Sequence, residues 1–309
     1  MTKTRESGKT AQDGVVLALG VFDGVHAGHK YLLSIARKDA DDMGLPLHVY
    51  TFYEHPAAVL QGKPVPSLTT IEQKIGLLAT SGMDCLHLEH FTPEFADMTY
   101  AEFIDMLRED IGMRHLVIGQ GAAFGRDNLG SVSRLAEEAD ELGITLRVVP
   151  PVTAGGVAIS SSRIRLALAH GDIEYANACL GRPYTLSGTI QHGDSRGHTL
   201  GFPTANLRPA SGMLIPATGV YLTRVQLAGE KEPMQAMTNI GVHPTVDELT
   251  EPMVETFILD FEGDIYGQNV EIELLMRLRD ERAFGSIDAL KEQIDKDVLE
   301  ARQYFSKLG

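Results

Sequence analysis

Tryptophan is absent from this 309-residue chain, and aromatic residues make up only 6% of it. A base-stacking platform for single-stranded nucleic acid is therefore poorly supported. Basic residues are also in the minority, and the formal charge is −15. An acidic surface repels nucleic-acid backbones and anionic membranes, so we expect neither as a partner. Small phosphate-bearing ligands are not excluded, because a local group of residues can bind them even on an acidic protein.

Cysteine and long apolar runs are equally scarce. Cys85 and Cys179 are the only two cysteines, far apart and outside any CxxC spacing, which favours a reducing cytoplasm over a disulfide framework. The polar stretch 1–14 lacks the apolar core of a signal peptide, and no apolar run approaches the roughly 20 residues of a membrane helix. The sequence therefore predicts a soluble cytoplasmic protein without a membrane segment, and it leaves a homo-oligomer open.

The first half of the chain alternates short apolar runs with helical patterns. The apolar runs predict strands at 15–21, 46–52, 83–88, 114–119 and 144–150. Between them, apolar residues at helical spacing predict helices near 27–43, 71–80, 100–110 and 131–143, the first with Leu32, Ala36, Ala40 and Met43 on one face. Two short helices at 160–171 and 172–181 end this half. The alternation is typical of βα units around a mostly parallel sheet.

The pattern changes after Arg182. Strand-like runs follow one another without helices, at 184–193, 219–229, 231–241, 252–263 and 268–279. Only 287–308 returns to a helical pattern. Consecutive short strands indicate an antiparallel sheet or a small barrel. We therefore predict two domains, residues 1–182 and 183–309.

Two glycine-containing motifs are weak. SGKT at 7–10 lacks both the upstream glycine and the preceding strand of a phosphate loop. VIGQGAAFG at 117–125 follows a predicted strand, but its third glycine is one position late and no helix opens there. Nicotinamide-dinucleotide binding is therefore not favoured.

The stretch GVFDGVHAGHK follows the first predicted strand and opens a helix. Gly20 and Gly24 allow a sharp turn, and Gly28 allows close backbone approach at the helix start. Such a helix N-terminus attracts anions, and His26 and His29 beside it can donate hydrogen bonds to phosphate oxygens. Zinc would need further ligands, and no HExxH or CxxC companion is present. The glycine context favours phosphate chemistry over zinc binding or simple packing.

This stretch resembles the first signature of the nucleotidyltransferase superfamily, whose histidines contact ATP phosphates during adenylyl transfer. The resemblance implies catalytic roles for His26 and His29. It also implies ATP binding by Gly20, Phe22, Asp23, Gly24, His26, Gly28 and His29. The later stretch ISSSRIR resembles the second element of the superfamily, although alone it is an N-capped helix with solvated arginines. It adds Ser160, Ser161, Ser162 and Arg165 to the expected ATP site.

In the second half, GHTLGFPTANL offers oxygen ligands two residues apart, Thr204 and Asn206. Mg²⁺ binds such donors together with phosphate oxygens. From these residues alone, a magnesium–nucleotide corner and an ordinary Pro-Thr turn are equally good interpretations.

With this stretch, the runs GVYLTRV, TNIGVHPT, VETFILDFEGDIYG and LRDERAF resemble, in order, the riboflavin kinase module. From about Val15 to the last helix, the chain resembles the bifunctional riboflavin kinase/FMN adenylyltransferase family. The resemblance implies a Rossmann-like α/β nucleotidyltransferase domain with a parallel sheet, followed by an antiparallel β-barrel kinase domain with a C-terminal helix. It implies that riboflavin is phosphorylated to FMN and FMN is adenylylated to FAD, with ATP as co-substrate and Mg²⁺ as cofactor.

The resemblance also assigns residues of the kinase site. Glu255 becomes the base that accepts the proton of the riboflavin 5′-hydroxyl, a task that suits a carboxylate. Thr204 and Asn206 become ligands of Mg²⁺. ATP binding in this domain is assigned to Gly201, Pro203 and Thr204.

The chain departs from the family pattern at a few positions. Gly121 and Ala122 replace an acid and an aromatic residue, Glu54 replaces a proline, and Ser162 replaces a threonine. The first pair removes bulk and charge from the expected flavin side of the adenylyltransferase site. Two alternatives follow: a riboflavin kinase with a degenerate N-terminal binding or regulatory module, or a nucleotidyltransferase that adenylylates another phosphate.

Overall fold

The computed structural model describes residues 14–126, 130–191, 202–243 and 251–307. The chain divides into two compact units, Met1–Ser161 and Ser162–Gly309. Each unit has its own sheet and core. The predicted boundary lies between 182 and 183, about 20 residues later. It assigns the two helices at 161–180 to the first half, whereas the internal contacts group them with the second. Which segment folds independently stays a prediction.

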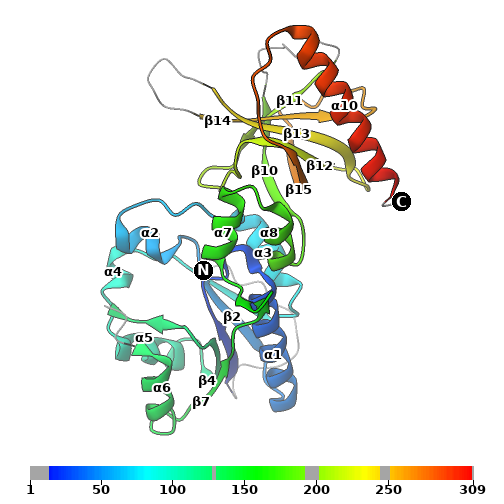
Figure 1. Ribbon diagram of the computed structural model, residues 1–309. Helices are drawn as coiled ribbons and strands as arrows, with labels where there is room; N and C mark the ends of the chain where they lie inside the picture. The colour runs from blue at the N-terminus through cyan, green and yellow to red at the C-terminus, as the bar shows by residue number, and fades with distance from the viewer. Residues whose placement is uncertain (1–13, 127–129, 192–201, 244–250, 308–309) are drawn as a thin grey trace. The chain divides into compact units, whose positions relative to one another are not determined.

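The first unit is built on a five-stranded parallel sheet with the strand order β3-β2-β1-β4-β7 (Figure 1). The three central strands, β2, β1 and β4, are largely buried on both faces, as strands inside a parallel sheet are. The edge strands are more open: β3 is half-buried throughout, and β7 exposes Thr145 and Arg147. The bounds are β1 Val15–Leu19, β2 Leu47–Phe52, β3 Cys85–Glu89, β4 Met113–Gly119 and β7 Thr145–Val149.

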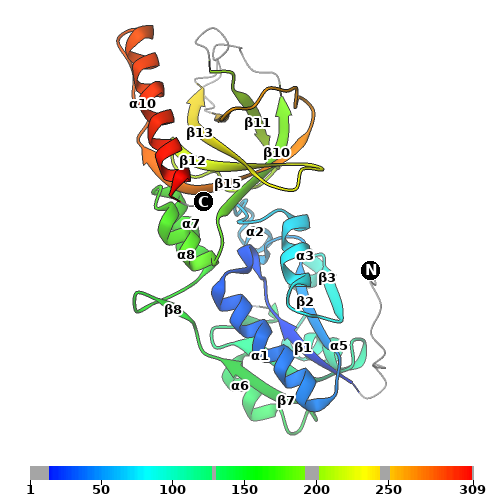
Figure 2. The same cartoon turned by 90° about the vertical axis from the view of Figure 1, so that its right-hand side faces the viewer.

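Helices cover both faces of this sheet. Helix α1 (Ala27–Met43) lies along one face (Figure 2) together with α3 (Ile71–Ala79), and their apolar residues form one core with Val16, Ala18 and Val49. Helices α5 (Tyr100–Glu109) and α6 (Val132–Glu138) cover the other face (Figure 1).

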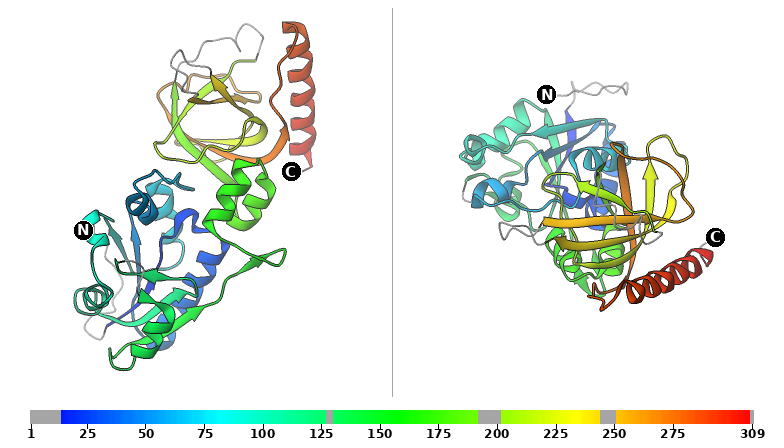
Figure 3. Two further views of the ribbon diagram at one scale, coloured as in Figure 1. Left: turned by 60° about the vertical axis from the view of Figure 1, so that its left-hand side comes forward. Right: turned by 90° about the horizontal axis from the view of Figure 1, so that it is seen from above.

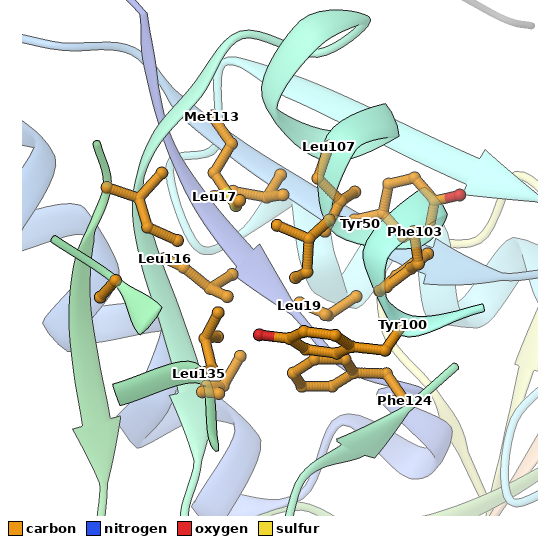
Figure 4. Packing of buried hydrophobic residues seen from close by; sticks show 14 of the residues in the cluster. Leu17, Leu19, Tyr50, Tyr100, Phe103, Leu107, Met113, Leu116, Phe124 and Leu135 are labelled. Atoms are coloured by element: carbon orange, nitrogen blue, oxygen red, sulfur yellow. The ribbon is translucent and has the colours of Figure 1, made fainter. Parts of the chain in front are cut away.

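The second core contains most of the buried aromatic residues of the unit. Tyr50, Tyr100, Phe103 and Phe124 pack with leucines of β1 and β4 between the sheet and α5 (Figure 4). One predicted core position differs: Met43, the last residue of α1, is 46% exposed because the helix ends there at Gly44.

Short elements complete the first unit. A 3₁₀ turn at Asp23–Val25 joins β1 to α1. The short helix α2 follows β2, and the short helix α4 precedes α5. Two small hairpins, β5–β6 and β8–β9, follow β4 and β7. The remaining bounds are α2 Pro56–Gln61, α4 Pro93–Ala96, β5 Ala123–Phe124, β6 Gly130–Ser131, β8 Thr153–Ala154 and β9 Val157–Ala158.

The second unit is a closed antiparallel barrel with the strand order β10-β11-β14-β13-β12-β15. Helix α10 (Ile287–Ser306) runs beside it (Figure 3, left) and packs on its outer surface through Ala301 and Phe305. The strands are β10 Tyr184–Gln191, β11 Ala205–Pro209, β12 Gly219–Leu227, β13 Met234–His243, β14 Glu251–Ile258 and β15 Asn269–Arg279. The expected fold class is confirmed, and the end of the stretch GHTLGFPTANL, from Ala205 on, belongs to strand β11.

Two helices, α7 (Ser161–Ala169) and α8 (Ile173–Leu180), precede the barrel. Helix α8 is tied to it by Asn177, whose amide donates to the carbonyl of Leu274 at 2.8 Å and accepts from the backbone N–H of Tyr184 at 2.7 Å. Within the described ranges of the chain, no helix is long and apolar enough to cross a membrane.

Candidate functional sites in the two units

The turn between β1 and α1 is held in a strained backbone conformation. Phe22 (φ 50°) and Val25 (φ 38°) lie in the left-handed region that side chains disfavour, and Gly24 between them has φ 76°. Phe22 is fully buried, and the buried Asp23 accepts a hydrogen bond from the backbone N–H of Leu68 at 3.0 Å. Such strain persists only where surrounding contacts enforce it, and it clusters at functional sites.

His26 caps the helix that follows. Its Nδ1 accepts the backbone N–H of His29 at 3.3 Å, and the two imidazole rings stack with centroids 3.6 Å apart. A Cβ at Gly28 would lie 3.1 Å from the His26 ring. Glycine is therefore needed at this position so that the ring can fold over the first turn of α1.

His29 is partly buried, close to His26 and Lys74. Its Nδ1 is buried and has no hydrogen-bond partner among the described residues, and Phe22 packs edge-on against the ring at 5.2 Å. Burial holds the pKa of His29 well below its ordinary value, with further contributions from His26 and Lys74. In this state the ring is an uncharged group with an unused polar atom, at the N-terminus of a helix that favours anions.

Lys74 is a functional candidate that the sequence analysis did not identify. This lysine of α3 is buried, and its ammonium donates to the carbonyls of Phe52 at 2.6 Å and Val21 at 3.3 Å. Burial lowers its pKa to about 8, partly offset by the nearby Asp23 and Glu54 carboxylates. The signal in the sequence is a lysine on the same helix face as Ile71 and Leu78, where an apolar residue is expected.

The second predicted element approaches the turn from far along the chain. The hydroxyl of Ser161 donates to the backbone carbonyl of Asp23 at 2.9 Å, and Ser160 precedes it in the first unit. Ser162 and Arg165 belong to the second unit, on α7. Their roles at an ATP site stay predictions.

A cavity of about 500 Å³ opens beside the same turn. Its walls are mainly apolar and aromatic, and include Gly20 and Val21 after β1 together with Phe52 at the end of β2. The opposite wall includes Gly121 and Ala122, the positions where the chain departs from the family pattern. Further lining residues are Phe91, Phe95, Met98, Phe103 and Phe124. The size and lining suit a flat aromatic ligand.

Glu54, another departure from the family pattern, supports this cavity from outside. Its carboxylate pairs with the ring of His90 at 2.8 Å and accepts the backbone N–H of Phe91 at 3.0 Å. Partial burial raises its pKa, but these hydrogen bonds outweigh that effect and the net shift is downward. Glu54 thus fixes the segment that presents Phe91 to the cavity.

The candidate site of the second unit is assembled by strand register. Asn206 on β11 lies directly opposite Glu255 on β14, which lies opposite Asn239 on β13. Directly opposed side chains share one face of a sheet and have Cβ atoms about 5 Å apart. Two of the predicted residues, distant in sequence, are therefore neighbours, and Asn239 joins them.

These three side chains lie on the outer surface of the barrel. Thr256, next to Glu255, is buried inside it, where its hydroxyl is 2.9 Å from that of Thr238. Because side chains alternate along a strand, Glu255 faces outward. Thr204 and Pro203 precede β11, and Phe202 packs edge-on against Phe257 at 5.5 Å. Gly201, predicted to bind ATP, lies outside the described residues.

Glu281 is a further residue that sequence reasoning missed. Its Oε1 lies 2.6 Å from where a Cβ of Gly241 would be, and Asn239 Nδ2 lies 3.5 Å from the same point. The absence of a side chain at Gly241 therefore leaves room for the Glu281 carboxylate beside Asn239. Asn239 and Gly241 are connected to Glu255 through the register of the barrel strands, which cannot be read from the sequence.

The structure defines a two-part class of protein: an α/β unit whose first helix is capped by a histidine, followed by a closed antiparallel barrel. The family model for FAD synthetase matches residues 8–163, and the model for riboflavin kinase matches residues 180–305. The chain belongs to the bifunctional riboflavin kinase/FMN adenylyltransferase family, as the sequence resemblance indicated.

Individual relatives agree with this membership. The chain is 38% identical to the Bacillus subtilis bifunctional riboflavin kinase/FMN adenylyltransferase, over 97% of this chain and 95% of the relative. The Escherichia coli K12 protein of the same name is 36% identical over 95% of this chain and 94% of the relative. A crystal structure described as a macrolide-efflux protein from Streptococcus pneumoniae has a TM-score of 0.85 and 33% identity, covering 96% of each chain.

Proposed function

We propose that this chain phosphorylates riboflavin to FMN on the outer face of its barrel and adenylylates FMN to FAD at the β1–α1 turn of its α/β unit. The matches to both family models support the pair of activities over a kinase with a degenerate N-terminal module. The observation that carries the site assignment in the barrel is the register that sets Asn206 opposite Glu255.

In the kinase step, the carboxylate of Glu255 accepts the proton of the riboflavin 5′-hydroxyl. The resulting oxygen attacks the γ-phosphorus of ATP, a new P–O bond forms, and ADP leaves. Asn206 and Asn239, opposite Glu255 on the two neighbouring strands, orient this carboxylate. Thr204 and Asn206 offer the hard oxygen donors that Mg²⁺ takes, so the residues fit the ion. When bound there, Mg²⁺ neutralises phosphate charge.

In the adenylyltransferase step, a phosphate oxygen of FMN attacks the α-phosphorus of ATP, and pyrophosphate leaves. The flavin ring occupies the apolar cavity, and the phosphates meet the N-terminus of α1. His29 donates from its ring nitrogen to the charge that develops on phosphorus, and the ring of His26 keeps it oriented. Ser160 and Ser161 contribute hydroxyls to the same phosphates, and the roles expected for Ser162 and Arg165 rest on the sequence resemblance alone.

The test is a product assay on the purified chain. Incubated with riboflavin, ATP and Mg²⁺, it should release FMN and then FAD, and omission of Mg²⁺ should stop both. A second reaction begins from FMN. FMN without FAD in both reactions would establish a kinase with a degenerate N-terminal module, and AMP transfer only to another phosphate compound would establish a different nucleotidyltransferase.

The remaining expectations are part of the same proposal. A cytoplasmic location, the absence of nucleic-acid and membrane partners, and the open question of a homo-oligomer rest on composition alone and stay predictions.

A further inference from the structure

A group of metal-ligand side chains lies in the first unit, at a distance along the strands from the proposed adenylyltransferase site of that unit. His48 is the second residue of β2, and the register places it opposite Cys85, the first residue of β3. His87 lies two residues further along β3, so it shares the same face of the sheet. All three side chains are half-buried at the edge strand of the sheet.

The potential ligand atoms of these residues are close enough for one ion. The three atoms all lie within 4.8 Å of one another, and His87 Nε2 is 3.0 Å from His48 Nδ1. Around a tetrahedral zinc ion with Zn–N bonds of about 2.0 Å, two ring nitrogens are roughly 3.3 Å apart. Small rotations of the two rings therefore make room for an ion where the rings now share a hydrogen bond.

The chemistry of the three ligands is selective. Burial lowers the pKa of His48, and the neighbouring Asp84 offsets only part of this shift. Neutral imidazoles and a thiolate are the donors that zinc-like ions prefer, whereas Mg²⁺ prefers oxygen. Magnesium used in phosphate chemistry would not compete for this cluster.

The cluster is also separate from the proposed adenylyltransferase site. In this parallel sheet the cavity lies at the carboxyl ends of the strands, where Phe52 ends β2, whereas His48 and Cys85 stand at the strand starts. None of the residues assigned to ATP, flavin or Mg²⁺ is part of it.

We propose that His48, Cys85 and His87 form a binding site for a borderline-soft divalent cation of the zinc type, with a fourth coordination position filled by water. Binding replaces the hydrogen bond between the rings by two metal–nitrogen bonds and adds one metal–sulfur bond, and the proton of the Cys85 thiol is released to solvent. The ion joins the edge strand β3 to β2, so its effect is on the stability of that edge.

The test is a Co²⁺ titration of the full-length, tag-free, EDTA-treated protein in excess Mg²⁺, because tetrahedral Co²⁺ reports thiolate ligation by its absorption. We expect one Co²⁺ per chain with a thiolate-to-cobalt charge-transfer band, displaced stoichiometrically by Zn²⁺. Cys85→Ser should abolish the band. Cys179→Ser, at the other cysteine, should keep it, because Cys179 is buried on α8.

Histidine variants complete the test. His48→Ala and His87→Ala should each weaken Co²⁺ binding at least tenfold, whereas the matched control His90→Ala, at an exposed histidine that pairs with Glu54, should not change it. FMN formation by the second unit verifies that each variant is folded there, and circular dichroism verifies the α/β unit. Absence of the thiolate band in the wild type, or its persistence in Cys85→Ser, would overturn the proposal.

A measurement on the wild type covers the case in which Cys85→Ser does not fold. Zn²⁺ should slow the alkylation of Cys85 by a thiol reagent at least tenfold, and His87→Ala should remove this protection. Equal alkylation rates with and without Zn²⁺ would overturn the proposal independently of the substitution at Cys85. Loss of adenylyl transfer leaves this test unaffected, since it measures metal binding only.

Discussion

The two candidate sites are built in opposite ways. In the α/β unit, the turn after β1, the cap of α1 and both histidines lie within a few consecutive residues, and the strained backbone at Phe22 and Val25 fixes them. In the barrel, Asn206, Glu255 and Asn239 come from three strands and meet only through register. The residues of the first site are close together in the sequence, whereas those of the second come together only when the barrel has formed.

This difference should be visible in how substitutions affect the activity of each site. A local site depends mainly on its own residues and on the few distant contacts that hold its turn, such as those of Leu68 and Ser161 with Asp23. A register-built site is lost together with its sheet, because a slip by one residue moves every side chain to the other face. The predictions below separate these two kinds of dependence.

The largest expected effect is at His29. Replacing it by alanine removes one hydrogen-bond donor to developing phosphoryl charge, which lowers FAD formation from FMN by roughly 10²–10³-fold. FMN formation from riboflavin should be unchanged, since it uses the barrel. Rates from separate assays of the two half-reactions decide this, and parallel loss of both activities would show that the sites are not independent.

The corresponding change in the barrel is Glu255→Gln, which keeps shape and removes the basic carboxylate. FMN formation should fall by on the order of 10², with FAD formation from supplied FMN intact. Thr204→Val should instead raise the Mg²⁺-ATP concentration needed for half-maximal rate, because a ligand oxygen becomes a methyl group. A wild-type rate for Glu255→Gln would exclude Glu255 as the base.

The same contrast explains what the sequence could predict. The parallel sheet, the barrel strands and the β1–α1 motif follow from periodicity and local glycine placement, which are properties of short segments. The family resemblance assigned Asn206 and Glu255 to one site, but only the structure shows their pairing, because register is a long-range property. Asn239, Glu281 and Lys74 were missed for this reason: each looks like an ordinary polar residue until its neighbours are known.

The cavity was also beyond sequence reasoning. Its aromatic lining comes from segments after β2, β3 and β4, and in the sequence these phenylalanines are typical core residues. The departures at Gly121 and Ala122 could be noticed, but only the structure shows that both line the cavity. In the same way, Glu54 stood out as a substitution, and its contact with Phe91 explains its position.

A pair of fragments tests which segment the barrel needs. Residues 162–309 keep α8, whose Asn177 makes two hydrogen bonds to the barrel, whereas 183–309 lose it. Two such bonds contribute about 2 kcal/mol, and the buried Ala176 and Cys179 of α8 add to this. We expect both fragments to make FMN, the shorter one with a lower free energy of unfolding in urea. Equal stability would support the 182/183 boundary as the true one.

A smaller effect follows from the lowered pKa of His29. The folded protein binds its proton at lower pH than the unfolded chain does, so this contribution to stability is present above about pH 6.5 and is lost as the pH falls below it. The loss is at most about 1.4 kcal/mol per pH unit. Thermal unfolding of the wild type and His29→Gln at pH 7.5 and 5.5 measures it, and the variant should lose less stability on acidification.

The smallest expected effect is at the wall of the cavity, where Gly121→Asp with Ala122→Phe restores the family pattern. A Cβ at Gly121 meets no atom within 4 Å, so the backbone there accepts a side chain. An aromatic ring at position 122 would stack on the flavin, and such contacts contribute about 0.5–1.5 kcal/mol. The Kd for FMN should therefore fall by a few-fold to about tenfold, as measured by quenching of flavin fluorescence. Ala122→Leu is the matched control, because it adds apolar volume without a ring and should give less than half of this gain in free energy. Unchanged or weaker FMN binding in the double variant would place the flavin elsewhere in the unit, while His29→Ala would still report on the phosphate site.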